Sequence, residues 1–204
     1  MEKSPSKEPE SLSPFECTAG DPGAWQEVAH DLVGCANIIL DALRIREGPD
    51  RQTGSAGAGA FWRTPMMLYG LAVENLMKAV IVARKPISDI CFPLSEGLFP
   101  RWFKSHDLLA LAKRADLGVS RSQEHLLRRL RVFVECGKYP VGLREGQDYS
   151  THVFSDPLDW NDVFQLLEYL EEELQKASSG YLTAPPDLRA IHRLCPRRES
   201  PGYG

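Results

Sequence analysis

The sequence lacks the short motifs that mark several common classes of enzyme and metal-binding protein. The Gly-rich stretch 47–60 contains neither G-x-G-x-x-G nor G-x-x-x-x-G-K-S/T, so no phosphate-binding loop is indicated. No Ser/His/Asp triad, H-E-x-x-H pair or acidic cluster with metal-ligand spacing stands out. There is no C-x-x-C pair, and so no sign of a zinc ribbon or redox motif, among Cys17, Cys35, Cys91, Cys136 and Cys195. We therefore expect neither a cofactor nor a bound metal.

Long uninterrupted apolar runs are also missing. Residues 1–14 have no apolar stretch of the kind that a secretory signal needs. The longest apolar run, around Met66–Ala83, contains Glu74, Asn75 and Lys78, which would be costly in the middle of a bilayer. An odd number of widely spaced cysteines, five in this chain, is typical of proteins with free thiols in a reducing compartment. We expect a cytoplasmic protein with no membrane span.

The remaining composition is typical of one globular domain with polar ends. The chain has 204 residues, of which 43% are hydrophobic and 25% are charged. Its net charge of -4 excludes a globally basic nucleic-acid coat but allows a local basic patch. We expect a disordered tail at 1–20, a domain at 21–178 with a flexible loop at 47–60, and a Pro/Arg-rich tail at 179–204.

Apolar residues recur at helical spacing in five segments: 25–43, 66–82, 105–117, 122–134 and 160–174. The second segment is apolar nearly all round, which predicts a central helix. Asp21, Ser105 and Ser120 are the expected N-caps of the first, third and fourth segments. The first helix is expected to bury Trp25, Val28, Leu32, Cys35, Ile39 and Leu43. No segment alternates like a strand, so the sequence predicts an all-α, antiparallel bundle of about five helices.

Charge is segregated along the chain. Residues 101–131 contain eight basic and three acidic residues, and residues 154–174 contain seven acidic residues and no basic one. One interpretation is that neighbouring helices, or two copies of the chain, pair these complementary faces. The other is that the basic segment contacts phosphates.

Three segments in a fixed order carry a resemblance. They are Tyr69–Ala79 with Glu74 and Lys78, the tetrapeptide Ser105–Leu108, and Leu127–Phe133 followed by Gly137–Val141. Together they resemble the HEPN superfamily, the higher eukaryotes and prokaryotes nucleotide-binding domains. The resemblance implies an antiparallel helical bundle that often forms a homodimer. It also implies a nucleotide or RNA ligand, and a partner protein encoded nearby, as in toxin–antitoxin or defence systems.

Ribonucleases of this superfamily use an Arg followed, after four to six residues, by a His, and the resemblance offers one such match, Arg101 and His106. His would handle protons and Arg would stabilise the phosphate charge, without a metal. The alternative is that His106 is a first-turn residue that caps a helix. Arg121 and His125 are one intervening residue short of the motif, and His125 is also expected on a solvated face beside Arg129.

The candidate ligand-binding residues are Glu74, Lys78, His125, Arg129, Lys138 and Tyr139. Glu74 and Lys78 are four residues apart on the predicted central helix, so they form either a buried structural ion pair or part of a ligand site. Lys138 could contact an anion, and Tyr139 precedes a proline that favours an extended backbone. Three functions are open: a non-catalytic HEPN-like protein that binds a nucleotide, RNA or protein; a metal-independent endoribonuclease; and a structural module whose acidic last helix binds a basic partner.

Overall fold

The computed structural model describes residues 18–47, 63–85, 102–136 and 160–178. These residues form five helices and no strand: α2 (Pro22–Glu47), α4 (Arg63–Arg84), α6 (Leu108–Arg114), α7 (Arg121–Cys136) and α9 (Trp160–Ser178). The all-α prediction is confirmed for this part of the chain. Residues 1–17 of the predicted tail at 1–20, residues 48–60 of the predicted loop at 47–60, the predicted tail at 179–204, and the candidates Arg101, Lys138 and Tyr139 lie outside the described residues. Residues 18–20, which we expected to belong to the disordered tail, are described, and Ala19 is 5% exposed and accepts a hydrogen bond from Trp25 Nε1.

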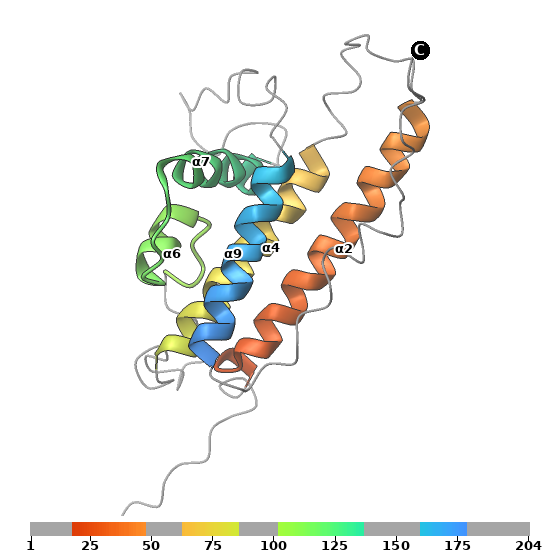
Figure 1. Cartoon of the computed structure of the whole chain (residues 1–204). Helices are drawn as coiled ribbons and strands as arrows, with labels where there is room; N and C mark the ends of the chain where they lie inside the picture. The colour runs from red at the N-terminus through yellow and green to blue at the C-terminus, as the bar shows by residue number, and fades with distance from the viewer. Residues whose placement is uncertain (1–17, 48–62, 86–101, 137–159, 179–204) are drawn as a thin grey trace, which may run out of the picture.

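Helix α4 is the centre of the fold, as its apolar circumference predicts. It contacts α2, α6, α7 and α9, and Figure 1 shows it running opposite to α2 and beside α9, with α7 lying across one end of α4 and α9. By length and composition alone, an 18-residue window of α4 could cross a membrane, and 72% of that window is buried inside the protein. A helix packed inside a bundle meets the same criteria.

The predicted buried face of α2 is right only in part, because Trp25 and Leu32 are partly buried and pack against the core. Val28 is 47% exposed and Cys35 is exposed, although both belong to the expected apolar stripe. The face that α2 buries consists of small and polar residues together with two larger apolar ones: Gln26, Ala29, Val33, Ala36, Asn37 and Leu40. The polar members have partners, since the Tyr69 hydroxyl donates to Asn37. Alanine leaves room for the large side chains of α4, so bulk alone did not identify the buried face.

Helix α7 packs closely against α4 at a glycine. A Cβ on Gly70 would lie 2.5 Å from Cγ2 of Val134 and 3.2 Å from the backbone oxygen of Leu130. Only glycine permits this approach without displacing a neighbour. The predicted core residues of α7, namely Leu126, Leu127, Leu130, Phe133 and Val134, are all buried. The predicted capping box is also confirmed, because Gln123 N donates to Ser120 Oγ and Ser120 N donates to Gln123 Oε1.

Helix α6 is shorter than predicted, and its N-cap is Asp107, not Ser105. Oδ1 of Asp107 accepts a hydrogen bond from Ala110 N at 3.1 Å. Ser105 Oγ instead accepts from Asp107 N at 3.1 Å, which closes a turn before the helix. His106 therefore precedes the cap and is not a first-turn residue. Both Ser and Asp are good caps, and the aspartate two residues later takes the position.

Candidate functional site

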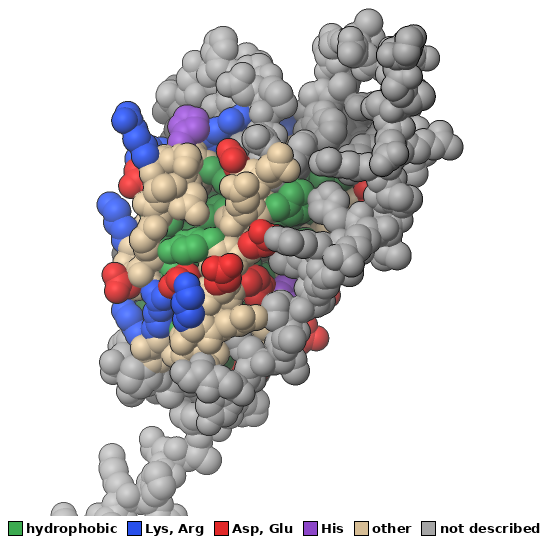
Figure 2. Space-filling model, in the orientation of Figure 1, with side chains coloured by type: hydrophobic (Ala, Val, Ile, Leu, Met, Phe, Trp, Pro, Cys, Tyr) green, Lys and Arg blue, Asp and Glu red, His purple; other side chains and the backbone are tan. Residues whose placement is uncertain are grey.

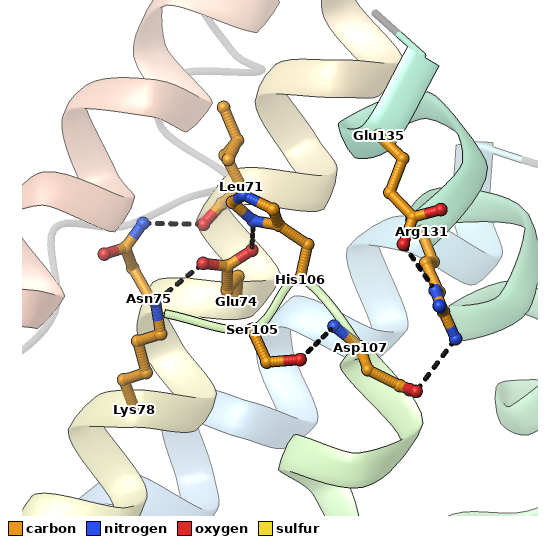
Figure 3. A network of polar contacts seen from close by, with 9 residues as sticks. All are labelled: Leu71, Glu74, Asn75, Lys78, Ser105, His106, Asp107, Arg131 and Glu135. Atoms are coloured by element: carbon orange, nitrogen blue, oxygen red, sulfur yellow. Dashed lines mark hydrogen bonds and ion pairs between the residues drawn. The ribbon is translucent and has the colours of Figure 1, made fainter. Parts of the chain in front are cut away.

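A buried carboxylate on α4 holds two of the predicted site residues. Glu74 Oε1 accepts from Lys78 Nζ at 2.6 Å, and Glu74 Oε2 lies 2.8 Å from His106 Nδ1 (Figure 3). The side chains of Glu74 and Lys78 are only 4% and 8% exposed, whereas that of His106 is 38% exposed. The structure thus brings together three residues that are 4 and 32 positions apart.

The contact with Glu74 fixes which nitrogen of His106 carries a hydrogen. A carboxylate can only accept, so Nδ1 of His106 must donate to it. In a neutral ring, Nε2 of His106 then carries a lone pair. A carboxylate that orients an imidazole in this way is the arrangement used when histidine acts as a general base. Lys78 already balances the charge of Glu74, so the fold does not depend on His106 for that balance.

The turn at 105–107 connects this centre to α7. Arg131 donates to Asp107 Oδ2 at 2.8 Å and to Glu135 Oε1 at 2.8 Å (Figure 3). Asp107 therefore caps α6 with one oxygen and binds α7 with the other. The orientation of His106, its neighbour in the chain, is set from both sides: by α4 through Glu74 and by α7 through Asp107.

Aromatic rings enclose the buried end of Lys78. Its Nζ lies 5.5 Å from the centroid of Trp25 and 5.4 Å from that of Phe103. Phe103 is 2% exposed and packs edge-on against Trp102, so these two residues anchor the loop to the core as their bulk predicts. Arg114 lies over the other ring of this pair, with its guanidinium carbon 4.2 Å from the Trp102 centroid.

A basic face extends over the end of α6 and the start of α7, and we define it by Lys113, Arg114 and Arg121. All three are exposed, and only six residues separate Arg114 from Arg121. Lys113 and Arg121 form no ion pair with any residue in the described ranges. Figure 2 shows several Lys and Arg side chains on the left side of the molecule, with Asp and Glu side chains among them. Farther along α7, Arg128 is paired with Glu124 at 3.1 Å and Arg131 with Asp107.

The candidates His125 and Arg129 lie on α7, apart from the Glu74 centre. His125 is exposed and Arg129 is half-buried. Neither contacts Glu74, Lys78 or His106, whose described partners are one another and the aromatic rings around Lys78. The structure thus places two candidates beside the basic face and three in the buried centre.

A second buried carboxylate escaped the sequence analysis. Glu171 on α9 is 4% exposed, and its two oxygens contact Gln26 Nε2 and His30 Nε2, each at 2.7 Å. Gln26 and His30 are four residues apart on α2, so this cluster joins α2 to α9. The available signal was a glutamate between Leu170 and Leu174 in an otherwise apolar stripe, facing polar residues at helical spacing on α2.

The acidic residues of α9 are partly engaged inside the protein. Glu173 accepts from Arg84, which also donates to the carbonyls of Ala115 and Asp116 at the end of α6. The hydrogen bond from Lys176, supported by Arg84, lowers the pKa of the Glu173 carboxyl. These contacts hold α9 to the other helices and leave fewer of its carboxylates for an external partner.

Searches for known relatives identify none. No protein-family model, no curated protein and no solved structure matches the chain. In the ranges that the structure describes, no group of three or more His, Cys, Asp or Glu side chains could hold a metal ion.

Proposed function

We propose that this chain is a HEPN-like, non-catalytic protein that binds a phosphate-bearing ligand, RNA or a nucleotide, on the basic face of α6 and α7. One observation carries the proposal: two exposed cations, Lys113 and Arg121, have no ion-pair partner among the described residues and lie at adjacent helix ends. Phosphates are the ligands that such unpaired cations attract, and the attraction is independent of base sequence.

The stacked pair of Arg114 and Trp102 adds a site for a base. An arginine plane already held over an indole has its torsions restricted by that contact. Arginine planes and aromatic rings are the surfaces on which unpaired RNA bases stack. Arg114 directly follows Lys113 in α6, so a single strand whose phosphates contact Lys113 would find this stacking partner nearby.

The arrangement of the three segments that resemble the superfamily supports the HEPN-like part of the proposal. Glu74 in the first segment contacts His106 in the second. Gly70, also in the first, lies against Leu130 in the third. The first segment therefore contacts both the second segment and residues 127–133 of the third, although they are far apart in sequence. The same resemblance leads us to propose a partner protein encoded nearby, of the kind found in toxin–antitoxin or defence systems.

The test is binding of a fluorescent single-stranded RNA, followed by anisotropy. We expect Lys113→Ala combined with Arg121→Ala to weaken binding about tenfold or more at low salt. Lys176→Ala is the control, because it also removes an exposed positive charge but from the acidic helix α9, where Lys176 is paired with Glu173. Competition with an unlabelled nucleoside triphosphate distinguishes a nucleotide site from an RNA site. Equal affinity of the wild type and the double variant would refute the proposal.

A metal-independent ribonuclease is the second candidate, and the Glu74–His106 contact favours it. A general base needs an accessible nitrogen held in one tautomer, and His106 offers this. The resemblance names Arg101 as the phosphate-binding partner of His106. Lys78 reduces the negative charge of Glu74, which makes Glu74 a weaker support for an imidazolium than an unpaired carboxylate would be.

Cleavage assays in EDTA separate the two candidates. Non-catalytic binding predicts no cleavage of structured or single-stranded RNA by the wild type. Cleavage that is lost in both His106→Ala and Arg101→Ala, with the helical circular dichroism unchanged, would establish the ribonuclease instead. Cleavage that survives both changes would point to a contaminant or to Arg121 and His125.

A further inference from the structure

Three histidines lie in the described ranges, and they differ in what holds the ring and in how far the ring reaches solvent. His30 is held by the buried carboxylate of Glu171, and its side chain is only 17% exposed. His125 is exposed and contacts no carboxylate among the described residues. His106 combines a carboxylate, Glu74 at 2.8 Å from Nδ1, with a side chain that is 38% exposed. A histidine that acts as a nucleophile needs both features.

The contact with Glu74 makes Nε2 the nucleophilic atom of His106. Nδ1 donates its hydrogen to the carboxylate, so the lone pair of the neutral ring is on Nε2. When Nε2 forms a bond to an electrophile, the ring becomes positively charged. The carboxylate beside Nδ1 stabilises this charge, as it does for the imidazolium of a catalytic triad.

The charges near His106 favour an anionic electrophile. Lys78 balances Glu74, so an anion that approaches the ring is not repelled by an unpaired carboxylate. Lys104, two residues before His106, is exposed and forms no ion pair with any residue in the described ranges. A phosphoryl group is an anionic electrophile whose oxygens are stabilised by cations during transfer.

The backbone on both sides of His106 is held in turns. Ser105 N donates to Trp102 O at 3.2 Å, and Asp107 N donates to Ser105 Oγ at 3.1 Å. Arg131 binds Asp107 from α7 and balances its charge. The ring is therefore positioned before any reaction partner arrives, which lowers the entropic cost of the reaction.

We propose that Nε2 of His106 accepts a phosphoryl group from an activated donor, an acyl phosphate or a phosphoramidate. The lone pair of Nε2 forms the N–P bond, while the bond from phosphorus to the oxygen or nitrogen of the donor breaks. Its electron pair leaves with the donor, as a carboxylate or an amine. The hydrogen on Nδ1 stays between the ring and Glu74, and Lys104 contacts the phosphoryl oxygens. Each chain takes up one phosphoryl group, so the step is independent of RNA binding on the basic face.

Incubation of the full chain with phosphoramidate in one arm and acetyl phosphate in the other tests the proposal. Peptide mass spectrometry should find the phosphoryl group at His106, formed about tenfold or more faster than at His125 in the same molecule. The label should be lost in acid and kept in alkali, as expected of an N–P bond, and ³¹P NMR should show the Nε2 isomer. Reaction with only one of the donors would support the proposal and identify the donor class. No label at His106 from either donor, or equal rates at the two histidines, would overturn it.

Two variants separate a reactive ring from one that is merely exposed. Glu74→Gln combined with Lys78→Gln keeps polar side chains without a buried charge, and should slow phosphorylation of His106 about tenfold. Lys104→Ala changes an exposed residue that the fold does not need, and should slow it about threefold or more. Lys176→Ala is the matched control and should leave the rate unchanged. Circular dichroism checks the fold of each variant, and a rate unaffected by Lys104→Ala and by the double change would overturn the proposal.

Discussion

Helix α4 is buried on nearly every side, whereas α2 buries one face and exposes the opposite one. The two helices also treat polar groups differently. In α4, Glu74 is balanced by Lys78 from the same helix. In α2, Gln26 and His30 contact the carboxylate of Glu171, which belongs to another helix, α9. The comparison teaches that the buried charge of α4 is balanced within that helix, while the polar core residues of α2 have their partners on other helices: Glu171 of α9 for Gln26 and His30, and Tyr69 of α4 for Asn37.

The largest effect on stability is expected from removing one member of the buried Glu74–Lys78 ion pair in α4. Lys78→Met leaves the Glu74 carboxylate buried beside only His106, and removing one member of a buried ion pair costs about 3–5 kcal/mol in free energy of unfolding. Replacing both Glu74 and Lys78 by Met should recover most of this loss, because the uncompensated charge is gone. Urea denaturation measures both values. If the double variant were as unstable as Lys78→Met, the loss of stability would not come from an uncompensated charge on Glu74.

Two glycine substitutions compare the space around α4 at Gly70 with the space around α2 at Gly34. Gly70→Ala in α4 should destabilise the protein by about 1–3 kcal/mol, since the new methyl group overlaps Val134 on α7. Gly34→Ala in α2 should stabilise it by about 0.5–1 kcal/mol, because nothing lies within 4 Å of the new Cβ and alanine favours the helix. Thermal melts of the two variants give the comparison. Changes of the same sign would contradict it.

His30 and His106 contact the buried carboxylates Glu171 and Glu74, and replacing each histidine tests how far its carboxylate depends on it. His30→Ala leaves one oxygen of Glu171 without its partner, which costs about 1–3 kcal/mol for a buried acceptor. His106→Ala should cost less than about 1 kcal/mol, because Glu74 keeps Lys78 and the side chain of His106 is more exposed. Denaturant titrations of both variants at neutral pH measure the order. If His106→Ala were the more damaging change, His106 would have a mainly structural role.

The smallest expected effect is a pH dependence where α4 meets α9. The hydrogen bond from Lys176, with Arg84, lowers the pKa of Glu173 from its ordinary value of 4.5. A carboxyl with a lowered pKa stabilises the fold above pH 4.5, and the stabilisation is lost as the pH falls through the lowered pKa. The advantage of the wild type over Glu173→Gln should be below about 1 kcal/mol at neutral pH and disappear at acid pH. An advantage that grows on acidification would contradict the assignment.

The fold was predictable where large apolar residues face the core. The central position of α4 and the buried face of α7 follow from the spacing of residues such as Leu127 and Leu130. The face of α2 was not predictable in this way. Its core side combines Val33 and Leu40 with alanines and with amides whose partners come from other helices, and its solvent side carries Val28 and Ile38. Hydrophobic spacing therefore indicated a face at the border of the core, where Trp25 and Leu32 are partly buried and Val28 is exposed.

The candidate site was predictable only in part. The burial of Glu74 and Lys78 follows from the apolar helix around them, and both are buried. The contact between Glu74 and His106 joins residues 32 positions apart, so the sequence alone could not show it. The same holds for Asp107, where the choice of cap depended on Arg131 and Ala110 as well as on local propensity. Partners brought together by tertiary packing leave little trace in a single sequence.

The central claim is that phosphates bind the basic face of α6 and α7, and the salt dependence of RNA affinity tests it most directly. For single strands, log Kd changes with log salt concentration by about 0.7 for each phosphate contact. The account predicts that Lys113→Ala with Arg121→Ala lowers this slope by about 1.4 relative to the wild type, whereas Lys176→Ala leaves it unchanged. A slope that is the same in the wild type and the double variant would contradict the claim.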